Sequence, residues 1–317
     1  MHLRQATLAT WGGERGSATM KTWNMFRAAL VVATIGAFAG FPRASSQIVQ
    51  SGQNVAPAYE GWEPNPDGSF NLVFGYLNRN WEEELHVPIG PGNNIEPGGP
   101  DRGQPSYFFP RRNRFVFRVR VPKDFGNKEV VWTLTTGGKT ERAYGTLKPD
   151  YILDDMVIMS NTGAGGALSS TPDMLGNKAP VVKVEGSNAR SVKAGEPLTL
   201  TAIATDDGKP SPRSMPPALG GNYILPNSAK GLRLSWFVYR GPGRAVTFNP
   251  PQSKVWEDTR DGGKSPWSAG WVNPPVPPDG KWTVRATFHQ PGNYVLRCQA
   301  HDGGLSSFED VSVVVVP

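Results

Sequence analysis

Four segments in the second half of the chain alternate apolar and polar residues with a period of two. They span 198–205, 232–239, 294–300 and 311–316. Successive side chains of a β-strand point to opposite faces of its sheet, so the alternation predicts strands with one buried face and one face in water. Four such strands separated by turn signals favour an antiparallel β-sandwich.

Glycine and proline interrupt regular structure along the whole chain. With 37 Gly and 30 Pro they occupy 67 of 317 residues, about a fifth against roughly 12% in average usage. This excludes long helical bundles. The apolar share of 38% still suffices for packed cores, and the charged share of 19% is too low for a disordered polyelectrolyte. We therefore predict an all-β fold class.

The first half has a strand pattern of its own. In Phe115–Val121, two Phe and two Val residues face one way and the arginines face the other. Residues 70–77 and 130–135 also read as strands, and the latter turns at Gly137-Gly138 and returns through 140–147. A second antiparallel sandwich is the simplest architecture for this half.

The N-terminal segment has the organisation of an export signal. Residues 20–27 carry two basic side chains, Lys21 and Arg27, and no acidic one; residues 28–41 form an apolar run, and 42–46 end in small residues. An apolar helix of this length would rise about 21 Å, less than the ~30 Å hydrocarbon core of a bilayer, which favours a cleaved signal peptide over a retained anchor. We expect an exported protein, periplasmic or extracellular, that contacts the membrane through this segment only if the segment is retained.

These patterns divide the chain into four parts. Residues 161–177 show neither helical nor strand periodicity and contain Gly163-Ala164-Gly165-Gly166, as in a linker. The predicted parts are a signal peptide or membrane anchor (1–46), a β-sandwich domain (56–155), a Gly/Ser-rich linker (156–177) and a second β-sandwich domain (178–317).

The basic charge of the chain is concentrated in its leader. Residues 1–46 hold five of the 33 Lys and Arg residues and one of the 27 Asp and Glu residues, so the remainder carries 28 basic against 26 acidic side chains. This near balance argues against nucleic acid as a partner. Cys298 is the only cysteine, which excludes an intrachain disulfide, and its alternation with Leu296 and Ala300 predicts a buried apolar position.

Several motifs of the second half occur together. Ala194-Gly195-Glu196-Pro197 precedes a strand that ends in Ala204-Thr205-Asp206-Asp207-Gly208, Trp236 lies within a strand, and Pro291-Gly292-Asn293-Tyr294 leads to Ala300-His301-Asp302-Gly303. With these motifs, residues 179–317 resemble a bacterial immunoglobulin-like domain of the PKD and cadherin-like group. The Trp-x-Phe-Gly-Asp-Gly stretch of PKD repeats is absent after Trp236, and the first half matches no family.

The resemblance implies strand roles and a class of function. Residues 198–205 would be strand B, the strand at Trp236 would be strand C, and 294–300 would be strand F, with Trp236 packed across the core from Cys298. Such sandwiches usually serve adhesion, spacing or binding.

Acidic residues follow strands B and F, which end on the same side of such a sandwich. Asp206, Asp207 and Asp302, with His301 beside them, then offer oxygens of the kind that Ca²⁺ prefers. The alternative is that these Asp-Gly pairs only form turns. Apart from this calcium hypothesis, we expect no cofactor.

Two aromatic segments are candidate partner-binding sites. Trp256, Trp267 and Trp271 lie in a long Pro/Gly-rich stretch between Tyr239 and Lys281, and Tyr107-Phe108-Phe109 ends a loop of the first half. Tryptophan and tyrosine are favoured anchors of protein interfaces, and flat indole rings also stack on sugars. The alternative is that the Trp rings fold back over a sheet face of the chain itself.

No catalytic set of residues is evident: His86, His289 and His301 are far apart and lack a paired motif. We therefore predict a non-catalytic exported protein-interaction module, an accessory or scaffolding subunit whose partners are proteins of an envelope or membrane complex. A carbohydrate-binding module acting through the loop Trp residues is the alternative, and a hydrolase on a sandwich fold comes third. Deleting 241–279 should abolish association and leave the fold intact.

Overall fold

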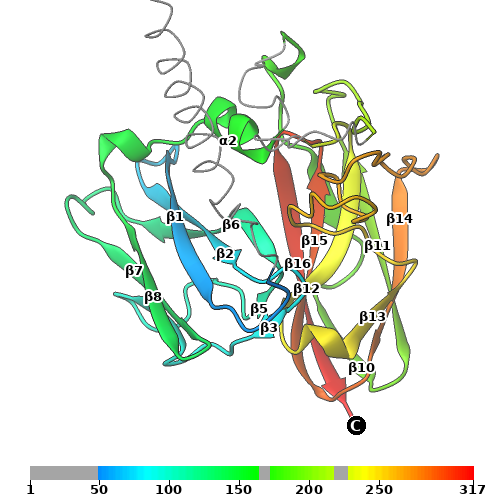
Figure 1. Cartoon of the computed structure of the whole chain (residues 1–317), viewed down its shortest axis with the longest axis horizontal. Coiled ribbons are helices and arrows are strands. Elements are labelled where there is room, and N and C mark those ends of the chain that lie inside the picture. The colour runs from blue at the N-terminus through cyan, green and yellow to red at the C-terminus, as the bar shows by residue number, and fades with distance from the viewer. Residues whose placement is uncertain (1–48, 164–171, 218–227) are drawn as a thin grey trace, which may run out of the picture. The chain divides into compact units, whose positions relative to one another are not determined.

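The computed structural model describes residues 49–163, 172–217 and 228–317, so the predicted signal sequence lies outside the described residues. Residues 48–317 form one compact unit that contains two β-sandwiches with separate buried cores (Figure 1). Most pairs of neighbouring strands in the described sheets are antiparallel. The predicted all-β class built from antiparallel sandwiches is confirmed.

The first sandwich has two three-stranded sheets, β1-β2-β6 and β4-β7-β8, and a short β3-β5 pair. Its strands are β1 (Val55–Pro64), β2 (Phe70–Asn78), β3 (Leu85–His86), β4 (Asn93–Glu96), β5 (Tyr107–Phe108), β6 (Arg111–Val121), β7 (Val130–Thr136) and β8 (Lys139–Gly145). Trp132 on β7 is fully buried at the centre of the core, with ring centroids 5.0 Å from Phe117 and 6.2 Å from Phe74. The apolar alternation of these strands therefore faces a shared interior.

One residue of β6 leaves the predicted face. Between the register pairs Phe74–Phe117 and Tyr76–Asn113, β6 has three intervening residues and β2 has one, which makes a bulge. Phe115 lies in this bulge with φ 53° and packs in a small separate cluster with Ile158. The expectation that Phe115 shares a face with Phe117 was wrong, because the extra residues reverse its direction.

The second sandwich has two four-stranded sheets, β10-β16-β15-β12 and β13-β14-β11-β9 (Figure 1). Its strands are β9 (Val181–Val184), β10 (Ala189–Lys193), β11 (Pro197–Thr205), β12 (Arg233–Arg240), β13 (Val246–Asn249), β14 (Lys281–Phe288), β15 (Gly292–His301) and β16 (Ser306–Val316). This is the immunoglobulin arrangement: β9, β11, β14 and β13 correspond to strands A, B, E and D of one sheet, and β12, β15 and β16 to strands C, F and G of the other. The eighth strand, β10, pairs in parallel with β16 at the edge of the second sheet. The predicted strands B, C and F are therefore β11, β12 and β15.

A tyrosine corner supports the immunoglobulin-like assignment. Tyr294, near the start of β15, is buried and donates its hydroxyl hydrogen to the backbone oxygen of Gln290 at 2.9 Å. Immunoglobulin folds place a tyrosine at the start of strand F with this backbone bond.

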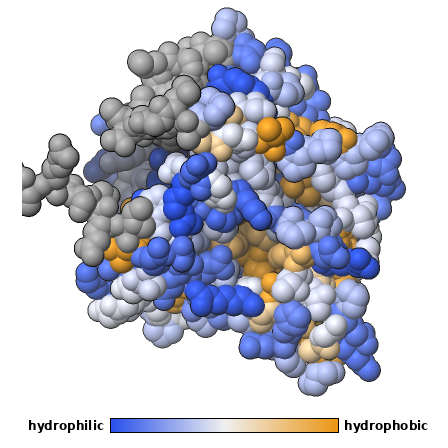
Figure 2. All heavy atoms as spheres, turned by 45° about the vertical axis from the view of Figure 1, so that its right-hand side comes forward, coloured by the Kyte–Doolittle hydropathy of each residue, from blue (hydrophilic) through white to orange (hydrophobic). Residues whose placement is uncertain are grey.

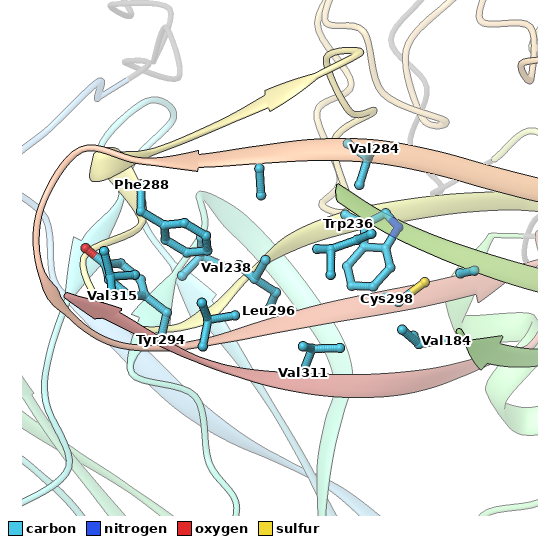
Figure 3. Packing of buried hydrophobic residues seen from close by; sticks show 14 of the residues in the cluster. Val184, Trp236, Val238, Val284, Phe288, Tyr294, Leu296, Cys298, Val311 and Val315 are labelled. Atoms are coloured by element: carbon cyan, nitrogen blue, oxygen red, sulfur yellow. The ribbon is translucent and has the colours of Figure 1, made fainter. Parts of the chain in front are cut away.

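The core of this sandwich corrects the predicted position of Trp236 (Figure 3). Trp236 and Cys298 are both buried, but they are register partners on the neighbouring strands β12 and β15. They therefore pack side by side in one sheet instead of across the core, because strands C and F belong to the same sheet. Val284 of β14 faces Trp236 from the opposite sheet, and Phe288, farther along β14, packs on Tyr294 with ring centroids 4.9 Å apart. Burial raises the pKa of the Cys298 thiol, as expected for an apolar position.

The segment predicted as a linker begins with a helix. Helix α2 (Asp155–Thr162) starts at Asp154, whose side chain accepts a hydrogen bond from the backbone N–H of Val157 at 2.8 Å, and it ends at Gly163. Its Met159 is buried and packs in a cluster with Leu305 of the second sandwich. Residues 164–171 lie outside the described residues. Helix α2 thus packs against residues of both sandwiches. Neither its cap at Asp154 nor the burial of Met159 could be inferred from the composition of the segment.

Candidate functional site

The outer face of the β12–β15 pair is covered by the first sandwich. Arg297 of β15 is 4% exposed and makes a bidentate ion pair with Asp310 at 2.7 and 2.8 Å. Its remaining nitrogen Nη1 donates to the backbone oxygen of Val116 in the first sandwich at 2.7 Å. The guanidinium lies 3.5 Å from the ring centroid of Tyr239 and 3.7 Å from that of Phe308. The face that alternation predicts to be wet is therefore an internal interface.

Residues 250–271, which we call the strap, run from the second sandwich to the first. Trp256 stacks on Phe109 with ring centroids 5.1 Å apart and an interplanar angle of 11°. Farther along the strap, Glu257 pairs with Arg114 at 2.9 Å, and Arg260 pairs with Glu82 of the first sandwich at 3.0 Å. The segment 241–279 also contains β13, so its deletion would remove a strand of the sheet together with these contacts. The deletion therefore does not separate association from folding.

An apolar groove lies where the strap, the second sandwich and the first sandwich meet. It has a volume of about 340 Å³. Figure 2, with the β11, β13 and β14 side of the molecule turned forward, shows apolar side chains inside a hollow bordered by polar ones. The walls are residues 236–238 of β12, 246–248 of β13, 251–256 of the strap, and Glu84, Tyr107 and Phe109 of the first sandwich.

The groove follows two strand edges. Three consecutive residues of β12, and three of β13, line it. Side chains of consecutive strand residues point to opposite faces, so a cavity touched by all three runs along the edge of the strand. Both strands are the outermost of their described sheets. The groove thus lies between two open strand edges, one from each sheet.

Two polar groups of the first sandwich, Glu84 and the Tyr107 hydroxyl, line the groove. The Tyr107 hydroxyl donates to the Glu84 carboxylate. Burial, and then the neighbouring Glu84, raise the pKa of Tyr107, while Arg244 opposes this shift. The Tyr107 ring rests directly on Gly243, where a Cβ would lie 2.4 Å from the ring. Any side chain at position 243 would therefore clash with the Tyr107 ring.

The structure brings three of the six predicted partner-binding residues to this groove, namely Trp256, Tyr107 and Phe109. Much of their ring surface is used within the chain, since Trp256 is 9% exposed and Tyr107 is 3% exposed. The other three residues lie elsewhere. Phe108 is fully buried in the first core, Trp267 is 9% exposed and donates to the Thr162 backbone oxygen at 3.3 Å, and the indole of Trp271 donates to Asn273 at 3.0 Å.

Sequence reasoning predicted the strand that contains 236–238 but missed the other strand of the groove walls, β13. Val246, Thr247 and Phe248 belong to a four-residue strand that was not predicted. Its alternation of half-buried and exposed residues is the signal that was available. Gln252 of the strap carries no such signal, although its side-chain oxygen accepts the backbone N–H of Trp236 at 3.0 Å, because that contact joins it to a strand 16 residues away in sequence.

The acidic residues proposed for calcium are engaged in turns. Asp206 accepts from the backbone N–H of Gly208 at 3.0 Å, and Asp207 accepts from that of Lys209 at 2.9 Å. Among the described residues, no group of three or more His, Cys, Asp or Glu side chains is placed to hold a metal ion. The bonds are those of Asp-Gly turns.

Asp302 closes the turn between β15 and β16 from a fully buried position. Its Oδ1 accepts the backbone N–H groups of Gly304 at 2.5 Å and Leu305 at 2.7 Å, and its Oδ2 accepts the Asn177 amide at 3.0 Å. Burial is the main cause that raises the pKa of Asp302 to about 6, and the charge of Asp206 adds to it. The loops after β11 and β15 therefore approach each other.

The raised pKa of Asp302 gives a pH-dependent contribution to stability. Its unfolded value is about 3.9, so the folded state favours the protonated form. The contribution is fully present below about pH 4 and is lost as pH rises through about 6, roughly 2–3 kcal/mol. Asp302→Asn should remove this pH dependence, since the amide oxygen can accept the same two backbone N–H groups. Urea unfolding of the wild type and the variant at low and neutral pH gives the change in the free energy of unfolding with pH. The same change in both proteins would contradict the role given to Asp302.

One histidine and one hydroxyl come within hydrogen-bonding reach. Thr247 Oγ1 and His289 Nε2 are 3.2 Å apart, and both residues are exposed. No carboxylate orients the imidazole among the hydrogen bonds of the described residues. The pair is a contact between β13 and the end of β14, and nothing in this part of the chain completes a nucleophile, base and orienting acid.

Comparisons with known proteins assign no family. No protein-family model matches the chain, and no curated protein matches it. Similar solved structures include domains 4 and 5 of the S-layer protein SbsC (11% identity, TM-score 0.22, 60% of this chain and 66% of that chain). Others are the D00-D0 domain of intimin (11%, 0.23, 83% and 100%) and the fibronectin(III)-like modules of Clostridium thermocellum CbhA (11%, 0.21, 86% and 92%).

The chain spans only 66% of the SbsC fragment, 27% of the N-terminal eight Ig domains of Down syndrome cell adhesion molecule and 48% of Sidekick-1 immunoglobulin domains 1–4, two further similar structures. The immunoglobulin-like assignment of the second sandwich therefore rests on its own strand order, and the narrower PKD and cadherin-like grouping stays a prediction. In the part of the chain that is described, no helix has the length and apolar character needed to cross a membrane.

Proposed function

We propose that this chain is a non-catalytic protein-interaction module of the cell envelope, an accessory or scaffolding subunit that holds a partner protein in the groove between its sandwiches. The observation that carries the proposal is the apolar groove of about 340 Å³ along the open edges of β12 and β13. Apolar hollows with a few polar groups at the border are typical of partner and ligand sites. Export through residues 1–46 would place it on the outer side of the cytoplasmic membrane.

The construction of the two sandwiches supports a scaffolding role. Side-chain charges at the junction are paired, as in Arg297–Asp310 and Arg114–Glu257. Such pairing fixes the geometry of the groove walls, which come from both sandwiches, before a partner arrives. A sugar-binding role through the three Trp residues draws less support, since Trp256 and Trp267 are each 9% exposed.

Thr247→Arg tests this proposal. Thr247 is an exposed residue of β13 that lines the groove, so arginine there should be compatible with the fold and place a charge in the apolar hollow. We expect affinity for the partner to fall on the order of tenfold or more. The measurement is native-gel separation and mass spectrometry after gentle detergent extraction of the tagged full chain from its own cells.

Thr140→Arg is the matched control, because Thr140 is an exposed strand residue of the other sandwich. Co-migration with a larger assembly that is lost in Thr247→Arg and kept in Thr140→Arg is the expected result. A chain that migrates alone, or an assembly that both variants retain, would overturn the proposal that the groove holds the partner.

A further inference from the structure

We infer that the groove receives an extended strand of the partner protein, which pairs with the open edge of β12 and extends its sheet. This inference rests on the proposed function and names the way in which the partner binds. It requires an unpaired backbone edge, a slot of limited length and an apolar wall beside it. The structure provides each of these.

The groove occupies a strand position that this sandwich leaves vacant. In variable-type immunoglobulin domains an additional strand, C′, extends the sheet beyond strand C. Strand C here is β12, and only residues 241–245 connect it to β13, with a short 3-10 turn over Gly243–Ala245. These residues are too few to form strand C′, so no described strand of the chain pairs with β12 on the side of the groove.

The backbone of β12 faces the groove with hydrogen-bonding groups. The N–H of Trp236 donates to the side-chain oxygen of Gln252 at 3.0 Å, so it points away from β15 and toward the strap. Residues two apart on a strand direct their backbone groups to the same side, which places the N–H of Val238 on this open side as well. Among the described residues, no loop or side-chain group bonds that N–H.

Two contacts limit the length of the open edge. At one end the N–H of Ser106, from the first sandwich, donates to the backbone oxygen of Tyr239 at 3.2 Å. At the other end the Gln252 side chain stands where a carbonyl of a neighbouring strand would lie. The edge between them, from Trp236 to Val238, fits a short extended segment.

The walls provide for the side chains of such a segment. Phe109, Phe237 and Trp256 form an aromatic wall, in which Phe109 contacts both of the other rings. Val246 and Phe248 of β13 line the groove as well. Strand addition combines main-chain hydrogen bonds with pockets for alternate side chains, so the partner segment must be apolar at alternate positions and free of proline where it pairs.

The test is to select binding segments and then measure how they bind. A phage-displayed library of random linear peptides is panned against the full chain, and selected peptides are resynthesised with and without N-methylation of the pairing amides. We expect peptides with alternating apolar residues, a loss of binding on N-methylation, and slower hydrogen exchange at the Val238 amide. Gln252→Ala should tighten binding roughly two- to tenfold, because the peptide then accepts the N–H of Trp236 without first displacing the Gln252 side chain.

Gln299→Ala is the matched control, since Gln299 lies on β15 outside this groove. Among the described residues, its side-chain amide donates only to the Ser306 hydroxyl. Equal affinity after N-methylation, no tightening in Gln252→Ala, or a library without binders would each overturn strand addition. In those cases the proposed function still stands if Thr247→Arg abolishes the native assembly, and it falls as well if that assembly survives the variant.

Discussion

Replacing Arg297 by alanine is expected to lower the free energy of unfolding by about 3–5 kcal/mol, the cost of removing one partner of a buried ion pair. The side chain is 4% exposed and forms two bonds with Asp310 and one with the backbone oxygen of Val116. Alanine leaves the Asp310 carboxylate without its cation and the Val116 carbonyl without its donor. It also removes the guanidinium from between the rings of Tyr239 and Phe308.

Denaturant unfolding followed by tryptophan fluorescence and by far-UV circular dichroism measures this effect. Because Arg297 bonds both sandwiches, we also expect the two probes to diverge in the variant, as one sandwich unfolds before the other. Arg297→Lys keeps the charge but loses the bidentate geometry and should fall between wild type and alanine. Arg285→Ala, at an exposed position of β14, is the control and should stay within about 0.5 kcal/mol. A similar change in both alanine variants would contradict the role given to Arg297.

Trp132→Ala should destabilise the chain by about 3–5 kcal/mol, the range for truncating a large buried aromatic residue. The ring is fully buried and packs against Phe117 at 5.0 Å and Phe108 at 6.3 Å. Its indole N–H donates to the side-chain oxygen of Asn93 at 2.9 Å, and Asn93 is itself fully buried. The substitution therefore opens a cavity and leaves a buried acceptor without its donor.

Trp132→Phe separates these two causes. It keeps most of the apolar volume and loses the bond to Asn93, so it should cost about 1–3 kcal/mol. Urea unfolding of the full chain gives both values, and Tyr144→Ala, at an exposed position of β8, is the control. If phenylalanine and alanine at position 132 destabilise equally, the hydrogen bond would account for the whole effect and the packing argument would be wrong.

The strand pattern of the second sandwich could be predicted because it is local. In β11, the residues Leu200, Ala202 and Ala204 are buried, and Thr201 and Ile203 between them are only half-buried, as period-two alternation requires. The same reasoning failed at Phe115, where two extra residues make a bulge that no composition signal marks. It also gave Cys298 the correct burial, but it placed Trp236 in the wrong relation to that residue.

The candidate site could be predicted only in part, because its aromatic residues are visible in the sequence and their surroundings are not. Trp256, Tyr107 and Phe109 were selected as interface residues, and they do meet around one groove. Their mutual contacts bury most of their ring surface. The groove itself depends on β13 and on the strap, which reach the site from separate parts of the chain.

Features that depend on neighbours along the chain could be inferred from the sequence: strands from alternation, turns from Gly, Pro and Asp, and a buried thiol without a disulfide partner. Which strand faces meet became clear from the three-dimensional structure. Alternation marks the face of β12 that carries Tyr239 as polar, yet that face is buried because Arg297 and the first sandwich cover it. Burial of a sheet face depends on what packs against it, and the residues that pack against this face are distant from it in sequence.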